Sequence, residues 1–179
     1  MSTTEGCPLI CTRIWGNVFE EGLAADNEEL RGFETVAVEW DECAKRILRK
    51  TTRSGREIGI QLAHQTLLRH GDILAREGDA PAIVVYLEPC EVLVVRPESV
   101  RQFGVVAYEL GNRHLPLEIT DKGEIVLLPD DPTKLLLAKL NAPFALETRR
   151  FQPIPKGGGH HHHHHLHHPH HGEEAVRLR

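Results

Sequence analysis

The chain has 179 residues, enough for one compact domain or two small ones, and its 40% apolar and 26% charged residues are ordinary for a globular protein. The net charge of −5, with basic residues scattered along the chain, gives no electrostatic case for binding nucleic acid. No apolar run approaches the roughly 20 residues of a membrane span, and the first residues lack a secretory-signal pattern. We therefore expect a cytoplasmic protein that does not enter a membrane.

The first half of the chain, residues 1–89, is predicted to be a small all-β domain. Residues 46–52 and 56–62 have the pattern of two strands joined by a tight turn that contains Gly55, which is typical of a β-hairpin. A second turn at 69–72 precedes another short strand. The apolar run 82–87 predicts a buried strand, and a proline two residues later marks its end.

The pattern changes at Cys90, where a domain of alternating strands and helices is predicted over residues 90–153. Residues 92–95 form its first strand, and Ser99 is a suitable N-cap for the helix that follows. Gly111 stands where a left-handed C-terminal cap is expected. The apolar residues at helical spacing are Val100, Phe103, Val106, Ala107 and Leu110.

The rest of this domain is predicted as a hairpin, a second helix and a last strand. The hairpin joins residues 115–120 to 124–128, the helix runs from an Asp131 N-cap and a following proline to Asn141, and the strand spans 144–151. The apolar face of the second helix is predicted to comprise Leu135, Leu136 and Leu140. The order β-α-β-β-α-β is that of a ferredoxin-like fold, so the predicted fold class is α+β.

Residues 154–179 are predicted to be a flexible, disordered His-rich tail, because they cannot bury enough apolar surface to offset the entropy of ordering them. The chain has thirteen histidines, and only His64, His70 and His114 precede residue 160. The tail histidines are His160, His161, His162, His163, His164, His165, His167, His168, His170 and His171.

This tail is suited to binding divalent metal ions. Neutral imidazole is a common ligand for Ni²⁺, Zn²⁺ and Cu²⁺, and a flexible segment can wrap around an ion without a preformed site. The Irving–Williams order favours Cu²⁺, so the tail sets the class of metal and not its identity. Six consecutive histidines also fit an expression tag. The irregular histidines at 167–171 and the charged end favour a natural tail, while the glycines at 157–159 keep the tag alternative open.

His114 is a candidate ligand on the folded part of the chain. It follows the predicted end of the first helix, where the helix dipole favours cations. A lone histidine at a helix end is more often a surface residue than a ligand, and one imidazole cannot hold an ion alone. A two-fold dimer would bring His114 of both subunits together.

The other potential ligands favour packing roles. His64 and His70 flank a segment rich in turns and are expected on the surface of the β-domain. The chain has no GxxxxGK[ST] phosphate loop, HExxH, GxSxG or CxxC motif, so the sequence does not support a GTPase or a common hydrolase. The cysteines are few and irregularly spaced, which favours reduced, structural thiols at Cys7, Cys11, Cys43 and Cys90.

Four strings in a fixed order carry a family resemblance. They are the Gly55–Gly59 string in the hairpin, the Gly71–Leu74 string after it, the Leu110–His114 string after the first helix, and the His-rich end. On these grounds the chain resembles, over nearly its whole length, the UreE urease accessory proteins, which are nickel metallochaperones.

The resemblance implies a homodimer in which His114 of each subunit binds Ni²⁺ and the tail histidines add ligands. It also implies that residues 1–89 contact partner proteins, and that nickel goes to apo-urease together with the accessory GTPase and other accessory proteins. Such a protein is not an enzyme. Some relatives carry further histidines where this chain reads 127–131, and here Asp130 or Asp131 could offer an oxygen ligand.

Two other functions remain open from the sequence. A His-rich nickel or zinc store or buffer would need only the tail, and His114 would then be incidental. An enzyme or binding module with an appended tag would have its chemistry in the β-domain.

Overall fold

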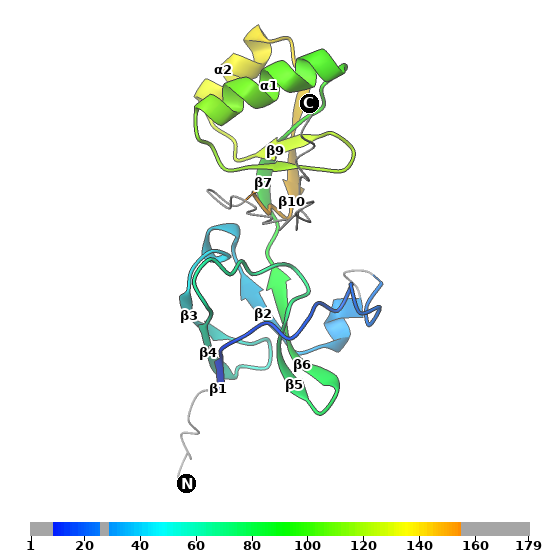
Figure 1. Ribbon diagram of the computed structural model, residues 1–179, viewed down its shortest axis with the longest axis vertical. Coiled ribbons are helices and arrows are strands. Elements are labelled where there is room, and N and C mark those ends of the chain that lie inside the picture. The colour runs from blue at the N-terminus through cyan, green and yellow to red at the C-terminus, as the bar shows by residue number, and fades with distance from the viewer. Residues whose placement is uncertain (1–8, 26–28, 155–179) are drawn as a thin grey trace, which may run out of the picture.

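The computed structural model describes residues 9–25 and 29–154 as two domains stacked along the long axis of the molecule (Figure 1). Strands β1 to β6 make up one domain, and the two α-helices lie at the far end of the other. The α+β class predicted from the sequence is confirmed. Neither α-helix in these residues has the length and apolar character needed to cross a membrane.

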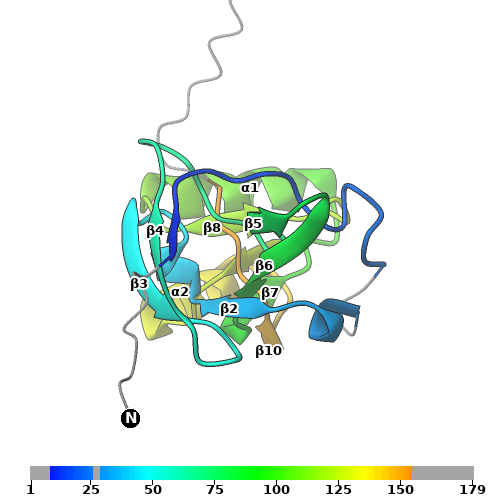
Figure 2. The same ribbon diagram turned by 90° about the horizontal axis from the view of Figure 1, so that it is seen from below.

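The N-terminal domain consists of two three-stranded sheets. The sheets have the strand orders β1-β4-β3 and β2-β6-β5, and they lie side by side when the molecule is viewed along its long axis (Figure 2). Two 3-10 helices, Glu29–Gly32 and Trp40–Glu42, connect them. The strands are β1 Leu9–Cys11, β2 Thr35–Val38, β3 Ile47–Thr51, β4 Glu57–Gln61, β5 Ile73–Glu77 and β6 Ala80–Leu87.

The predicted hairpin is the antiparallel pair β3–β4, with Leu48 opposite Ile60. Gly55 in its turn has φ +92°, a left-handed conformation that glycine adopts without steric cost. The buried residues of β4 alternate with exposed ones, which places Ile58 and Ile60 in the core. Two parallel pairings, β1 with β4 and β2 with β6, join segments distant in sequence and were not predicted.

The C-terminal domain has the predicted ferredoxin-like order. Its strands form one antiparallel sheet in the order β10-β7-β9-β8, with both helices on the face directed away from the N-terminal domain (Figure 1). The elements are β7 Cys90–Val95, α1 Val100–Asn112, β8 Leu117–Ile119, β9 Ile125–Leu127, α2 Asp131–Lys139 and β10 Phe144–Arg149.

The ends of α1 confirm one prediction and correct another. Ser99 caps the helix as predicted, because its hydroxyl accepts a hydrogen bond from the backbone N–H of Gln102 at 3.1 Å. Gly111, however, lies inside the helix, which continues to Asn112. The left-handed residue that ends the helix is His114, with φ +55°.

The start of α2 is also one residue away from its prediction. The N-cap is Asp130 and not Asp131, since the Asp130 carboxylate accepts a 2.7 Å bond from the backbone N–H of Thr133. The proline therefore occupies the second helical position, where its missing N–H costs no intrahelical hydrogen bond. Asn141 ends the helix as predicted, with φ +50°.

In both helices, some residues that helical periodicity predicted to face the core are exposed instead. Val100 is 91% exposed and Leu135 is 64% exposed, although both were assigned to apolar faces directed at the core. Leu137 is fully buried instead and had not been assigned to that face. A first-turn residue and the members of the leucine run 135–137 fit several helical faces equally well, so periodicity alone does not separate them.

Strand β7 is covered on both faces. Leu93 and Val95 face the helices, while Val92 and Val94 face the N-terminal domain, and all four are 0% exposed. Phe151, also 0% exposed, covers the second face together with residues of both domains. The side chains that enclose it are Val92, Val94, Val126, Trp40, Cys90 and Leu128.

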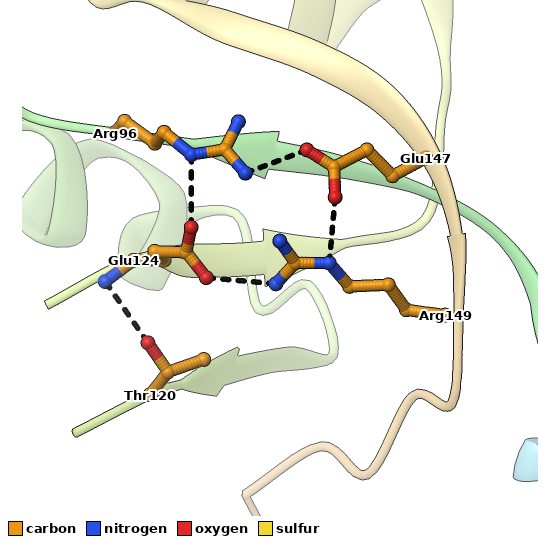
Figure 3. A network of polar contacts seen from close by, with 5 residues as sticks. All are labelled: Arg96, Thr120, Glu124, Glu147 and Arg149. Atoms are coloured by element: carbon orange, nitrogen blue, oxygen red, sulfur yellow. Dashed lines mark hydrogen bonds and ion pairs between the residues drawn. The ribbon is translucent and has the colours of Figure 1, made fainter. Parts of the chain in front are cut away.

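A closed ring of four ion pairs lies at the start of β9 (Figure 3). Arg96 donates to Glu124 at 2.8 Å and to Glu147 at 2.6 Å, and Arg149 donates to the other oxygen of each carboxylate at 2.7 Å. The Arg149 guanidinium lowers the pKa of Glu124, and the Arg96 guanidinium lowers the pKa of Glu147. Such a network holds three strands in register more effectively than isolated surface pairs do.

We predict that Glu124→Gln lowers the urea midpoint of unfolding more at pH 7 than at pH 3.5. A carboxylate whose pKa is lowered in the folded state stabilises it above the unfolded pKa, and this contribution disappears as pH falls through the folded pKa. Urea titrations at several pH values measure the difference. Glu57→Gln, which breaks the exposed pair with Arg49, is the matched control and should have a smaller effect. Equal losses for Glu124→Gln at both pH values would contradict the prediction.

Candidate metal site

His114 is exposed at the C-terminal end of α1. Its backbone N–H donates to the carbonyl of Gly111 at 2.9 Å, and its φ of +55° turns the chain out of the helix toward β8. A left-handed backbone is uncommon for residues other than glycine, asparagine, aspartate and histidine. This helix end therefore presents an imidazole to solvent on a backbone fixed by hydrogen bonds.

The exposed face of α1 that leads to His114 carries several apolar residues beside the exposed Arg101. Val100 is 91% exposed, Tyr108 is 68% exposed and Val105 is 42% exposed. Gly104 and Gly111 lie on the same side, and a Cβ at either position would meet no heavy atom within 4 Å. A glycine within a helix costs roughly 1 kcal/mol relative to alanine, and no neighbouring atom in the described structure requires its small size.

The two aspartates proposed as oxygen donors have partners of their own. Both carboxylate oxygens of Asp130 accept 2.7 Å hydrogen bonds from Thr133, one from its backbone N–H and one from its hydroxyl. Asp131 pairs with Lys134 at 3.3 Å on the surface. Within residues 9–25 and 29–154, no three His, Cys, Asp or Glu side chains come together in a way that could hold an ion.

The ten tail histidines, His160 to His171, lie outside the described residues. The structure gives the point from which the tail continues, because the backbone N–H of Ile154 donates to the carbonyl of Leu117 in β8 at 2.8 Å. The tail therefore starts beside the strand that follows His114 in sequence.

His70 has a packing environment inside the N-terminal domain. Its ring lies between Phe19, at a centroid distance of 5.3 Å, and Tyr86, at 5.5 Å, and its Nδ1 accepts a 3.2 Å hydrogen bond from the N–H of Leu87. Burial lowers the pKa of His70 to about 4, so the ring is neutral at pH 7. His64 is exposed on the loop after β4.

Three of the four cysteines lie in the described residues as free thiols, and Cys7 lies outside them. Burial raises the pKa of Cys11 and Cys90, and it raises the pKa of Cys43 to about 11. A thiol must lose its proton to bind a metal ion, so these environments disfavour the ligating form.

The sequence prediction did not include the exposed face of α1, because helical periodicity marks the residues that face the core. The spacing of Gly104, Tyr108 and Gly111 carried the signal. Two exposed glycines within a helix leave room for another molecule to approach closely.

Comparison with known proteins gives a consistent result over both domains. A family model described as "UreE urease accessory protein, N-terminal domain" matches residues 12–86, and one described as "UreE urease accessory protein, C-terminal domain" matches residues 90–175. Three relatives bear the name urease accessory protein UreE. The protein of Staphylococcus carnosus is 36% identical over 142 residues, which cover 79% of this chain and 91% of the relative.

The protein of Bacillus sp. (strain TB-90) is 38% identical over 125 residues, covering 68% of this chain and 83% of the relative. The protein of Geobacillus kaustophilus is 39% identical over 117 residues, which cover 65% of this chain and 78% of the relative. With both domain models matched in order, the chain belongs to the UreE family of urease accessory proteins, which act in urease maturation and are not enzymes.

Proposed function

We propose that this protein is a cytoplasmic homodimeric metallochaperone that binds Ni²⁺ and delivers it to apo-urease. The observation that carries the proposal is the position of His114, exposed at the end of an apolar helix face in a chain of the UreE family. Ni²⁺ is the cargo of the protein. Zn²⁺ and Cu²⁺ suit the same imidazole ligands.

The exposed face of α1 supports a dimer. Val100, Val105 and Tyr108 would lose their contact with water against a second copy, and Gly104 and Gly111 would allow the two helices to approach closely. In a two-fold dimer, residues close to the axis meet their own counterparts. We place the axis close to the C-terminal end of α1, so that His114 of both subunits face each other and the two imidazoles form the centre of the site.

The tail histidines complete the ligand set in this proposal. Two imidazoles leave most coordination positions of Ni²⁺ open, and ten further imidazoles on each chain can fill them. A tail that needs no fixed conformation can also release the ion when a better site, such as the one in apo-urease, becomes available.

The N-terminal domain is proposed to contact urease and the other accessory proteins, including the GTPase. The sequence between residues 45 and 56 contains six of the 21 basic residues and no acidic one, so this segment is a local cluster of positive charge. Three of these cations pair with acids, Arg49 with Glu57 among them. The sheet β1-β4-β3, to which this segment belongs, also carries two exposed isoleucines, Ile47 at 70% and Ile10 at 55% exposure. Exposed apolar residues with basic neighbours are suited to contact an acidic surface of a partner protein.

We predict that deletion of residues 157–179 removes most of the nickel capacity and leaves the fold and the dimer intact, because the tail supplies ligands and no core. Equilibrium dialysis gives the ions bound per subunit. A full-length variant with serine at all ten tail histidine positions is the matched control and should lose as much capacity. Unchanged stoichiometry in either variant would contradict a metal-holding tail.

We predict that His114→Ala weakens nickel affinity by ~10-fold or more, since even a residue that only supports a metal ligand is typically worth 10–100-fold. The free energy of unfolding should change by less than about 1 kcal/mol, because the side chain is exposed. His114→Gly, which suits the left-handed backbone, should give the same nickel result without strain. Urease activation at limiting nickel should fall with both variants.

His64→Ala is the control for removal of an exposed histidine outside the site. If His114→Ala activates apo-urease as well as the wild type does, the assignment of His114 as a delivery ligand is wrong. Storage by the tail alone would then be the better account.

We predict that nickel affinity falls steeply between about pH 7 and pH 5, because an ordinary imidazole has a pKa near 6.5 and must be neutral to bind. Several ligands are lost together, so more than one proton should be taken up per ion released. Isothermal titration at several pH values in buffers of different ionisation enthalpy measures both quantities. Affinity independent of pH would point to ligands other than histidine.

The same site requires two subunits, so nickel should favour the dimer by mass action. Gly104→Arg places a long charged side chain on the exposed face of α1 and should yield a monomer that lacks the tight site. Sedimentation with and without Ni²⁺ tests this, and a monomer that still binds tightly would exclude the shared site.

A further inference from the structure

The sheet β1-β4-β3 has one face in the core and one face in water. It forms one side of the N-terminal domain (Figure 2). Its inner face supplies Cys11, Ile58 and Ile60 to the core, so the residues that alternate with them along the strands point outward. Two of these outward residues are apolar, Ile10 at 55% and Ile47 at 70% exposure. Apolar side chains are thus in contact with water on the outer face.

Gly59 lies at the centre of this outer face. In the register of the sheet it stands opposite Ile10 of β1 on one side and Arg49 of β3 on the other. Residues directly opposite one another in neighbouring strands point to the same face, so these three form one row across the sheet. Because glycine has no side chain, the middle of the row leaves the backbone of β4 accessible between its two neighbours.

Neither the backbone nor the packing of Gly59 requires a glycine. Its φ lies outside the left-handed region, and an added Cβ would meet only the Cγ1 of Ile10 among the described atoms, at an ordinary contact distance of 3.7 Å. A glycine inside a strand weakens the strand, and it often marks a site where another backbone or a ligand approaches closely. The position is therefore better explained by a contact with another molecule than by the stability of this domain.

Two arginines without ion pairs lie at opposite ends of the β3–β4 hairpin. Arg46 directly precedes β3 and Arg56 directly precedes β4, and neither pairs with an acid within residues 9–25 and 29–154. The other cations of the segment have acidic neighbours: Lys45 has Asp41, Arg49 has Glu57, Lys50 has Glu42 and Arg53 has Glu34. Along the strands the two arginines are roughly 20 Å apart, at about 3.3 Å per residue.

We propose that this outer face binds a surface of a partner protein on which an apolar side chain lies between two carboxylates. The apolar side chain packs over Gly59 against Ile10 and Ile47, and the carboxylates accept paired hydrogen bonds from Arg46 and Arg56. The inference rests on the proposed function, which assigns partner contacts to this domain, and it adds the face and the chemistry of the contact.

Charge complementarity decides between the possible occupants. Residues 44–62 contain six basic residues and one acidic residue, although the whole chain has a net charge of −5. A second copy of the chain would bring the same arginines to the contact again, and like charges across an interface oppose binding. An acidic partner surface would instead supply the carboxylates that Arg46 and Arg56 lack.

The test uses the full-length dimer and two purified probes, apo-urease and the accessory GTPase, each immobilised for biolayer interferometry. Gly59→Thr fills the centre of the face with a residue that strands favour, so the urea midpoint of unfolding should stay the same or rise. The Kd for the partner should nevertheless rise about 10-fold or more. Ile47→Ser should also raise this Kd. Leu23→Ser, which removes an apolar residue 44% exposed outside this sheet, is the matched control and should leave the Kd unchanged.

A second arm tests the charges. Replacement of both Arg46 and Arg56 by glutamine should weaken binding and make the Kd less dependent on salt, because two charged contacts are lost. The matched control replaces Lys122 and Lys139, two exposed cations of the C-terminal domain, by glutamine and should keep the salt dependence of the wild type. Nickel stoichiometry from equilibrium dialysis should be the same in all these variants.

Loss of binding to one probe alone would support the proposal and identify the partner. If the Gly59, Ile47 and arginine variants bind both probes as tightly as the wild type, the outer face is not the contact site, and the proposed function stands. If the wild type binds neither probe, the proposed delivery function fails and this inference fails with it. If the variants change the mass of the protein in sedimentation without a probe, a second copy occupies the face and the assignment to a partner protein is wrong.

Discussion

Strand β7 must be covered on both faces, and this requirement shapes the whole C-terminal domain. Its apolar run, Val92 to Val95, is completely buried. Helices α1 and α2 cover one face, which leaves the other to be covered by something that the ferredoxin-like order does not contain. Phe151, which follows β10, and Trp40 of the N-terminal domain provide that cover. The same contacts that complete the core thus join the domains and direct the chain toward β8.

The two sides of α1 differ in their surroundings: one packs in the core and the other faces water. Its inner side contributes Val106 and Leu110 to the core, and Ser99 caps its start. Its outer side carries glycines that lower helix stability and apolar residues in contact with water, neither of which benefits a lone subunit. Both features are understandable if the face is shared with a second copy, and the helix then ends at the residue that the pair would use.

Local features of the fold could be predicted from the sequence because their causes are local. The β3–β4 hairpin follows from alternation around Gly55, and the C-terminal order follows from helical spacing between short apolar strands. The parallel pairings of β1 and β2 depend on partners that lie about 50 residues away, which no local pattern specifies. Gly111 was assigned to the helix end because glycine usually occupies that position, but a histidine can also adopt the left-handed conformation. For the candidate site, the sequence pointed to His114 and the tail. The packing of Phe151 between the two domains could not be predicted, because Phe151 reads in the sequence only as the end of a strand.

The choice of metal ion cannot come from the tail alone. Imidazole ligands without a fixed geometry follow the Irving–Williams order and bind Cu²⁺ more tightly than Ni²⁺. Selection by geometry requires ligands whose positions are fixed, and the proposed ligand His114 has a backbone held by a helix end. Two such residues across a two-fold axis would fix a separation and an angle, while the tail would adapt to fill the remaining positions. In the proposed function, the rigid pair would contribute discrimination and the tail capacity, and the partner that receives the ion would add a further selection.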